Sequence, residues 1–377
     1  MTINSDLDSF KTLDKNFTSQ LKQDDISLFY ILINFSSSTK FISDSIYSDF
    51  FIDLSIYLEQ FIVKYFDIEK ENNFFVSKAM NEKLIFEARR KFIERYVLQQ
   101  KHDKKAGTIY QDISTEITQF TGNLDQLTLA KYFLSLLANK EKYQKELDLA
   151  ATYCLQMIEN GSDLELFKIT RKIDPDNKIS HERVKRIKNS LEKDFLDFND
   201  SFIRTESMFT EANYCLFCHK REKDTCRFGF DNHKKGCLLD QKISEMNLLK
   251  SLGHNIAALS VIMLDNPMVI LTGKRICNAC SKACIFQKQD PVDIPSIETK
   301  IVEDVLSLPF GPEIYYLLSQ WQPLKRNHYL PSSIKNKNIL IAGLGPSSIA
   351  LSYYLLRNGY NVTAIDGLKI EEQIFDP

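Results

Sequence analysis

The first 200 residues place hydrophobic side chains at the three- and four-residue spacing of amphipathic helices. One such face is formed by Ile85, Ala88, Phe92 and Tyr96, and another by Val184, Ile187, Leu191 and Phe195. Asp125 precedes the apolar run of TGNLDQLTLAKYFLSLL and is a suitable N-cap, because its carboxylate can accept hydrogen bonds from a first helical turn. The pattern predicts a helical region over residues 1–205.

Helix-breaking residues support this division of the chain. Of the ten prolines only Pro175, and of the twelve glycines only three, precede residue 200. Proline and glycine are the least favourable residues inside helices, so their scarcity favours helix and their later abundance indicates turns. No motif in the helical region points to chemistry.

A helical hairpin is predicted between the two parts of a cysteine-rich stretch. The sequence GCLLDQKISEMNLLKSLGHNIAALSVIMLDNP has the composition of one or two helices, with Gly253 placed to interrupt them. Pro267 is placed to stop the second helix. Such a hairpin returns the chain, so that cysteines on either side of it can meet.

Near the C-terminus the pattern becomes strand, glycine turn, helix and strand. Residues 339–342 predict a short buried strand, residues 347–358 a helix that Gly359 ends, and NVTAID a second strand. We therefore expect a mostly α protein with four parts. They are a helical region (1–205), a helical domain (206–300), a spacer (301–336) and the first β-α-β unit of a Rossmann-type domain (337–377).

Charge and terminal sequence exclude several classes of protein. A net charge of −2 over 377 residues gives no basic field for nucleic acid. The start MTINSDLDSFK lacks the segments of a signal peptide, and no apolar run is a good membrane span. We expect a cytoplasmic protein, where thiols stay reduced.

Seven of the eight cysteines lie between residues 215 and 284. The first part of this stretch contains Cys215, Cys218, Cys226 and Cys237, and the second contains Cys277, Cys280 and Cys284 in the spacing C-x2-C-x3-C. Clustered thiolates repel one another, and a bound metal supplies the charge that holds them together. Cys154 stands apart and is predicted to be a small buried side chain.

The cysteine spacing is open to more than one interpretation. A cubane iron–sulfur cluster is favoured, because it takes several thiolates on one face. Zinc is the main rival, since Cys215, Cys218, Cys277 and Cys280 could form a tetrahedral site, and a redox-active C-x2-C pair is a third. Seven cysteines are one short of two four-cysteine clusters, so one site would need a non-cysteine ligand or an exposed iron. Nearby basic residues could offset cluster charge or form a solvated loop; they are Lys220, Arg221, Lys223 and Arg227.

The stretch KNILIAGLGPSSIALSYYLLRNGYNVTAIDG fits a dinucleotide-binding turn. Gly343 allows a tight turn, Gly345 lets the backbone approach a pyrophosphate at a helix N-terminus, and Asp366 can accept a hydrogen bond from a ribose hydroxyl. Ser348 occupies the third glycine position, a departure that loosens helix–strand packing. The predicted cofactor-binding residues are Gly343, Gly345, Pro346, Ser348 and Asp366.

The order of cysteine groups, spacer and glycine turn resembles the FAD-dependent pyridine nucleotide-disulfide oxidoreductase family. It is similar in particular to the glutamate synthase small subunit and to the N-terminal part of dihydropyrimidine dehydrogenase. The likeness covers residues 206–377 and is carried by KISEMNLLKSLGHNIAALS, DNPMVILTGKRICNACSKACIFQKQDPVDIPSIETK and GLGPSS with GLKIE. It implies two [4Fe–4S] clusters that exchange electrons with FAD, with NAD(P)H as the outer reductant.

The resemblance also implies ligands. Cys277, Cys280 and Cys284 become cluster ligands, and so do the four earlier cysteines, with their pairing open. The segment DPVDIPSIETK resembles a family segment that bears a carboxylate or amide at the position of Glu298, which becomes the candidate eighth ligand. The simpler interpretation of Glu298 is a surface glutamate on a helix.

The family's flavin domain continues well beyond the point where this sequence stops. We therefore expect a truncated or split chain with an incomplete FAD site, and a separate chain as the partner that carries the rest of the flavin and NAD(P) domain. The expected function is a relay of electrons between NAD(P)H or FAD and a partner through [4Fe–4S] clusters, with no acid–base catalytic set. The alternative is a zinc-stabilised helical interaction module without redox activity.

Overall fold

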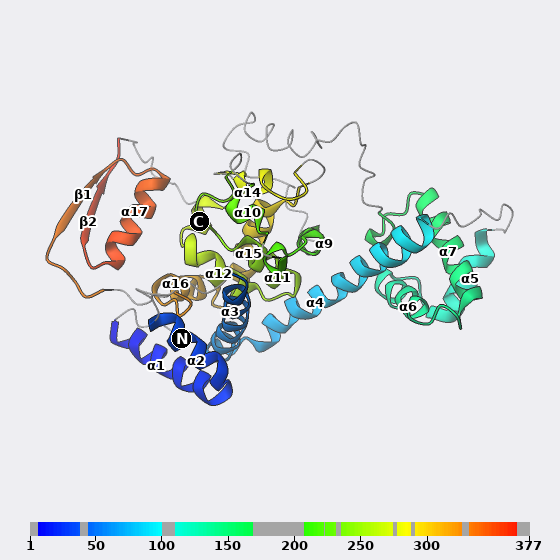
Figure 1. The fold of residues 1–377 in the computed structure, drawn as a ribbon, viewed down its shortest axis with the longest axis horizontal. Helices are drawn as coiled ribbons and strands as arrows, with labels where there is room; N and C mark the ends of the chain where they lie inside the picture. Colours follow the sequence, from blue (N-terminus) through cyan, green and yellow to red (C-terminus); the bar gives the residue numbers. More distant parts are fainter. Residues whose placement is uncertain are drawn as a thin grey trace, which may run out of the picture.

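The computed structural model describes residues 7–37, 44–99, 110–168, 207–221, 223–230, 235–273, 277–287, 291–325 and 332–367. These residues are mostly helical, with one two-stranded parallel sheet near the C-terminus (Figure 1). The amphipathic pattern predicted at residues 184–195 lies outside the described residues.

The elements follow one another in four stretches of the chain. The N-terminal stretch contains α1 (Leu7–Asp24), α2 (Ile26–Ser37), α3 (Asp44–Phe66), α4 (Glu69–Ala88) and the π-helical η1 (Arg89–Leu98). The next contains α5 (Tyr110–Thr121), α6 (Gln126–Ala138), α7 (Gln144–Glu159) and η2 (Glu165–Phe167). The cysteine-rich stretch contains α9 (Ser207–Tyr214), η3 (Cys218–Arg221), α10 (Thr225–Phe228), α11 (Ile243–Ser251), α12 (Asn255–Asp265), α13 (Val269–Thr272), α14 (Ala279–Lys282), α15 (Ile294–Leu306) and α16 (Gly311–Gln320). The last contains β1 (Asn338–Ala342), α17 (Pro346–Arg357) and β2 (Asn361–Ile365).

Among the described residues, two separate hydrophobic cores organise the helices. Helices α1–α3 share one core with α9–α16, and we call this assembly the cysteine-bearing body. The second core lies among the C-terminal end of α4 and η1, α5, α6, α7 and η2, and we call this assembly the distal lobe. The long helix α4 runs from the body to the lobe (Figure 1). The helical region predicted as one block is therefore divided between two cores.

Local sequence signals in the distal lobe are confirmed. Ile85, Ala88, Phe92 and Tyr96 are all buried on one face, although the second half of that face is π-helical. Asp125 caps α6, because its carboxylate accepts the backbone N–H groups of Leu127 and Thr128 at 3.0 Å each. Cys154 is fully buried in this core, as a small apolar side chain would be.

The predicted hairpin is formed by α11 and α12, which pack against each other. Gly253 joins them with φ +85°, and a Cβ at this position would lie 2.5 Å from the carbonyl oxygen of Phe75 in α4. The turn therefore requires glycine for both its backbone angle and its close approach to α4. Helix α12 ends at Asp265, ahead of Pro267, as predicted.

A buried carboxylate ties the N-terminal helices to this hairpin. Glu59 of α3 accepts hydrogen bonds from His254 Nδ1 at 2.8 Å, from Ala257 N at 2.9 Å and from Asn72 Nδ2 at 3.1 Å. Ala257 lies in the first turn of α12, where unpaired N–H groups and the helix dipole favour a negative charge. Helix α3 thus completes the fold of a segment almost 200 residues later in the chain.

The stretch predicted as a spacer contains the end of α15 and all of α16. Trp321 directly follows α16 and is fully buried, with its ring 5.3 Å from that of Phe17 in an edge-to-face contact. Beyond it, α17 rests on the C-terminal end of α16, where Tyr353 Oη donates to the carbonyl oxygen of Ser319 at 2.6 Å. Arg357 donates to the same carbonyl oxygen.

The C-terminal part, residues 332–367, is called here the glycine-turn unit. Strands β1 and β2 pair in parallel from Asn338 opposite Asn361 to Ala342 opposite Ile365, with α17 between them in sequence. The strand–helix–strand order is as predicted, but the prediction that the first strand is buried is wrong. Only Ile341 of β1 is buried and Leu340 is 66 % exposed, because one helix covers at most one face of so small a sheet.

Across the described residues, no helix combines the length and the apolar composition that crossing a membrane requires.

Candidate functional site

The first cysteine group joins four thiols from separate short elements. Cys215 follows α9, Cys218 opens η3, Cys226 lies in α10 and Cys284 comes just after α14. The thiols of Cys226 and Cys284 are hydrogen-bonded to each other, and Cys284 also acts electrostatically on Cys215 and Cys218. Helices α10 and α14 pack together, which explains how one member of the C-x2-C-x3-C triplet joins three earlier cysteines.

Burial dominates the electrostatics of this group. It raises the pKa of Cys215 to about 12 and that of Cys218 to about 11, because a thiolate there loses its hydration. The hydrogen bond from Cys226 lowers the pKa of Cys284 to about 7, and the same bond raises the pKa of Cys226. Without a bound cation, the group therefore prefers to keep most of its thiols protonated.

Backbone N–H groups point at the sulfur atoms of this group. The N–H of Phe217 donates to Cys215 Sγ at 3.5 Å. The N–H groups of Phe286 and Val292 stabilise the Cys284 thiolate and lower its pKa. Donors of this kind favour the thiolate, which is the form that binds a metal.

The second group contains three thiols and a carboxyl group. Its members are Cys237, in the turn before α11, Cys277, Cys280 of α14 and Glu298 of α15. Cys277 and Glu298 both act electrostatically on Cys237, and Cys237, Cys277 and Glu298 all act on Cys280. Burial is the largest cause that raises the pKa of Cys237 and of Cys280. Glu298 thus acts electrostatically on two of these cysteines, Cys237 and Cys280.

Glu298 is held in place by two amide side chains. Cys237 Sγ donates to Gln241 Oε1 at 3.7 Å, and Gln241 Nε2 donates to Glu298 Oε1 at 3.0 Å. Asn266 also hydrogen-bonds to Glu298, and its own Oδ1 accepts from Thr272 Oγ1 at 2.9 Å. Burial raises the pKa of the Glu298 carboxyl, and the two amides oppose that rise. The interpretation of Glu298 as an ordinary surface glutamate does not describe this environment.

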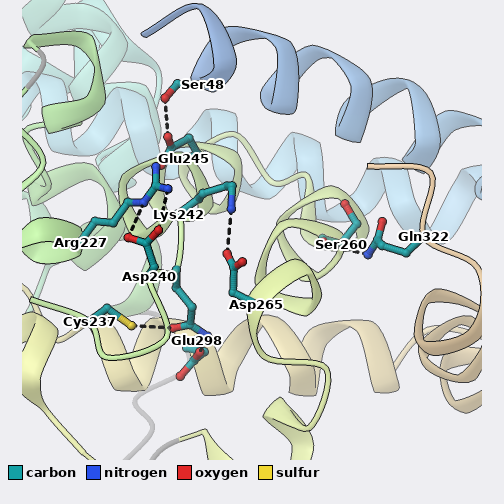
Figure 2. A network of polar contacts seen from close by, with 11 residues as sticks. Ser48, Arg227, Cys237, Asp240, Lys242, Glu245, Ser260, Asp265, Glu298 and Gln322 are labelled. Carbon is teal, nitrogen blue, oxygen red and sulfur yellow. Dashed lines mark hydrogen bonds and ion pairs between the residues drawn. The ribbon is translucent and has the colours of Figure 1, made fainter. Parts of the chain in front are cut away.

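One hydrogen bond connects the two cysteine groups, and one ion pair stabilises the hairpin between them. The backbone N–H of Cys237 donates to the carbonyl oxygen of Cys226 at 2.8 Å, which links a member of each group directly. The ion pair between Lys242 and Asp265, at 2.8 Å, joins the ends of the α11–α12 hairpin (Figure 2). This hairpin returns the chain from the first four cysteines to the triplet, as the sequence predicted.

All eight cysteines are free thiols. Cys154 is separate from the other seven, because it lies in the core of the distal lobe. Within the described parts of the chain, no group of three or more His, Cys, Asp or Glu side chains is arranged to hold a metal ion. The two groups are therefore sets of interacting side chains, not preformed coordination shells.

The glycine turn has the geometry that the sequence predicted for its first residues. Gly343 has φ +91°, a conformation that favours glycine, and its N–H donates to the carbonyl oxygen of Ile365 at 2.7 Å. Gly345 precedes α17, whose first residue is Pro346, and a Cβ at Gly345 would meet nothing within 4 Å. The space in front of this helix N-terminus is therefore open to a ligand.

Asp366 and Ser348 complete the predicted set. A carboxylate oxygen of Asp366 accepts a hydrogen bond from the N–H of Leu344 at 2.8 Å. This bond connects the glycine turn after β1 to the end of β2. Ser348 lies in the first turn of α17, and its carbonyl oxygen accepts from Ser352 Oγ at 2.7 Å. The structure brings Gly343, Leu344 and Asp366 together and leaves Ser348 with an ordinary helical role.

Gln241 and Asn266 were missed by the sequence analysis. Gln241 stands four residues after Cys237, and Asn266 directly precedes Pro267. Neither position marks a ligand partner by itself, because amides are common in turns. Only the return of the chain through α12 and α15 places both amides on Glu298.

Comparisons with known proteins give two relatives, both uncharacterized proteins of Rickettsia prowazekii (strain Madrid E). One is 62% identical over 109 residues, which are 29% of this chain and 15% of that protein. The other is 29% identical over an alignment of 281 residues that covers 65% of this chain and 95% of that protein. No family model and no solved structure matches the chain. The chain thus spans a small part of the first relative and most of the second.

Proposed function

We propose that this chain is an electron-transfer protein of the iron–sulfur flavoprotein type, which relays electrons between an NAD(P)H-reduced FAD and a partner through two [4Fe–4S] clusters. The observation that carries the proposal is the division of seven cysteines and Glu298 into two groups of four side chains. A cubane cluster with four protein ligands needs one such group each. Eight free thiols also fit a reducing compartment such as the cytoplasm.

In this proposal the first group, Cys215, Cys218, Cys226 and Cys284, holds one cluster. The second group, Cys237, Cys277, Cys280 and Glu298, holds the other. The side chains of both groups suit an iron–sulfur cluster. Burial keeps the thiols protonated when no cation is bound, and bound iron would supply the positive charge that stabilises the thiolates. The clusters would supply one-electron chemistry, and the chain's own residues bind them, exclude water and direct N–H groups at the sulfur atoms.

The glycine-turn unit is proposed as one edge of an FAD site. Gly343 and Gly345 open the backbone at the N-terminus of α17, where N–H groups and the helix dipole favour an anion such as a pyrophosphate. Two strands with exposed faces cannot enclose a flavin, since a ligand of this size is normally buried over most of its surface. Further polypeptide is needed, and we propose that a separate chain supplies it.

The direct test is metal analysis after anaerobic purification of the full chain. The proposal expects a brown protein with about eight iron atoms and as much acid-labile sulfide per chain. Stoichiometric zinc in a colourless protein would replace the proposal with the zinc-stabilised module.

The pairing of ligands can be tested separately. Cys280→Ser should remove about half of the iron and sulfide together, since one cubane of two loses a ligand. Adding Cys237→Ser should remove little more, because both belong to the second group, whereas adding Cys226→Ser should remove most of the remainder. Cys154→Ser is the matched control, since this thiol lies in the other core, and should keep the full content. Full iron in Cys280→Ser would contradict the assignment.

Glu298 has its own test. Glu298→Ala should change the electron paramagnetic resonance spectrum or the reduction potential of one cluster, because a carboxylate and a thiolate give different ligand fields. Glu303→Ala is the control on the same helix, since the Glu303 side chain is 43 % exposed and forms an ion pair with Lys300 at 3.6 Å. Identical spectra and potentials for both variants would remove Glu298 from the ligand set.

The flavin edge is tested by acid extraction and an NAD(P)H oxidation assay. The chain alone should release no stoichiometric flavin and should not oxidise NAD(P)H, because its glycine-turn unit leaves most of a flavin in water. Flavin binding and turnover should appear when the completing chain is added. Stoichiometric flavin with turnover in the chain alone would overturn the need for a second chain.

A further inference from the structure

The surface beside the second cysteine group is apolar and exposed. Leu238 and Leu239, which follow Cys237, are 73% and 51% exposed, and Ile270 and Leu271 of α13 are 48% and 62% exposed. Among the eight cysteines, Cys277 of this group is the one with an exposed side chain. Large exposed side chains that gather in one place mark interaction surfaces more often than isolated ones do.

Hydrogen bonds connect a neighbour of each of these two apolar segments to Glu298 of the second group. Leu238 adjoins Cys237, whose thiol is bonded to Gln241 and, through it, to Glu298. Leu271 adjoins Thr272, whose hydroxyl donates to Asn266, the other amide bonded to Glu298. Each segment is therefore next to a residue that is connected to the Glu298 carboxyl group through one amide side chain. We call Leu238, Leu239, Ile270 and Leu271 together the leucine face.

The charges around the cysteine groups are predominantly positive. Between residues 215 and 287, the exposed charged side chains of the described residues comprise one acid, Asp240, and five basic residues: Lys220, Arg221, Lys223, Lys235 and Lys282. Asp240 is paired with Arg227 in a two-pronged contact, with both N···O distances 3.0 Å. Lys235 stands two residues before Cys237, and Lys282 stands midway between Cys280 of the second group and Cys284 of the first, so both are exposed basic residues next to cysteines.

An apolar centre with a charged rim is the usual anatomy of a protein–protein interface. The rim is basic, so a complementary partner carries carboxylates around its own apolar contact. The apolar centre consists of four side chains, which suits the small and transient interfaces of redox encounters more than an obligate subunit contact. Because the Cys277 thiol is exposed, a partner that docks here would approach the second group at Cys277.

We propose that the leucine face, with Lys235 and Lys282 at its rim, docks a small acidic one-electron carrier protein. This inference rests on the proposed function and names the partner of the second group. The oxidised carrier would take up one electron and become reduced, and Cys237, Cys277, Cys280 and Glu298 would hold the cofactor that supplies that electron; no covalent bond forms or breaks. The basic rim guides the approach of the carrier, and the leucines exclude water at contact.

The test is a binding titration of the full, anaerobically purified chain with two carriers of opposite charge. An oxidised plant-type [2Fe–2S] ferredoxin of net negative charge is the probe, and a basic cytochrome c is its control. The ferredoxin should bind at low salt, and its dissociation constant should rise by about tenfold or more at high salt as the rim charges are screened. Failure of the ferredoxin to bind, insensitivity to salt, or equally tight binding of cytochrome c would overturn the proposal.

Matched variants locate the surface. Lys235→Glu with Lys282→Glu should weaken ferredoxin binding by about tenfold, whereas Lys145→Glu on α7 of the distal lobe makes the same kind of charge change elsewhere and should have little effect. Leu238→Ser with Leu271→Ser should also weaken binding by about tenfold, and Ile31→Ser with Ile33→Ser on α2 is the control for loss of exposed apolar side chains. Equal effects of test and control variants would place the contact elsewhere.

Iron and sulfide are measured on the same samples, which separates the two proposals. Binding that follows the predicted pattern in a chain without iron supports the docking surface and contradicts the proposed clusters. A full iron content without ferredoxin binding leaves the clusters supported and overturns the docking surface.

Discussion

The cysteine-bearing body and the glycine-turn unit both contain clear sequence motifs, but only the body has a substantial core. In the body, Trp321, Phe17 and the nine residues from Asn255 to Met263 are all buried. In the described residues of the glycine-turn unit, only Ile341, Arg357 and Gly359 are buried. Removing apolar surface from water is the main source of folding free energy, at about 25 cal/mol per Å². A recognisable motif therefore shows which local geometry forms and says little about whether that part is stable alone.

The two regions also differ in what their motifs bring together. In the body, short helices from distant parts of the sequence place eight candidate ligands in two groups. In the glycine-turn unit, the motif residues lie on one continuous strand–helix–strand segment and contact mainly one another. The comparison predicts that substitutions in the body affect the whole fold, whereas substitutions in the unit stay local.

The largest difference is expected between Trp321→Ala and Leu351→Ala. Trp321 is fully buried, packs against Phe17 and donates from Nε1 to Asp14 at 3.0 Å, so its loss should lower the free energy of unfolding by about 4 kcal/mol. Leu351 of α17 is 50% exposed, and its loss should cost no more than about 0.5 kcal/mol. Chemical denaturation followed by far-UV circular dichroism measures both, because Trp321 is the single tryptophan and its fluorescence is lost with it. Equal effects would contradict the comparison.

A somewhat smaller loss is expected for Glu59→Ala. The substitution leaves His254, Asn72 and the N–H of Ala257 without their shared acceptor inside the body, which should cost about 3 kcal/mol. Lys64→Ala on the exposed side of the same helix is the control and should change stability by less than about 0.5 kcal/mol. The same denaturation experiment decides it, and a loss below 1 kcal/mol would show that α3 is held mainly by its apolar contacts.

The seam between the two regions should respond to pH. Burial and the neighbouring Arg357 lower the pKa of Lys325 to about 8, from its ordinary value of 10.5. Between these values the unfolded chain binds more protons at Lys325 than the folded chain does, so this residue adds stability as the pH rises. Wild type should therefore gain stability relative to Lys325→Met between pH 8 and pH 10. Unfolding curves of the two proteins across that range give the difference, which isolates Lys325 from the cysteines that titrate in both. A flat difference would show that Lys325 is solvated.

The smallest effects are expected at the glycine turn itself. Gly343 has φ +91°, so Gly343→Ala should strain the turn by about 1 kcal/mol. Gly345 has φ −73° and open space around a Cβ, so Gly345→Ala should leave the turn unchanged within about 0.5 kcal/mol. Hydrogen exchange of the Leu344 N–H, which is bonded to Asp366, reports this local stability directly. Faster exchange in both variants alike would mean that the turn does not depend on the backbone angle of Gly343.

Much of the local structure could be predicted from the sequence because its causes are local. The cap at Asp125, the turn at Gly253, the end of α12 before Pro267 and the order of β1, α17 and β2 depend on residues only a few positions apart. The same holds for the burial of Cys154 and of the helical face that contains Phe92. Exposure of β1 was not predictable, because a buried-strand pattern does not say whether neighbouring strands are present.

By itself, the sequence determined the kinds of element, the concentration of seven cysteines between residues 215 and 284, and the glycine turn. Only the tertiary structure decided that Cys284 joins the first group while Cys277 and Cys280 join the second, and that Glu298 acts on the thiols of Cys237 and Cys280. It also decided that α1–α3 belong to the cysteine-bearing body. The physical reason is that helix, turn and cap preferences act over a few residues, whereas the meeting of Cys226 with Cys284 depends on how the α11–α12 hairpin packs and returns the chain.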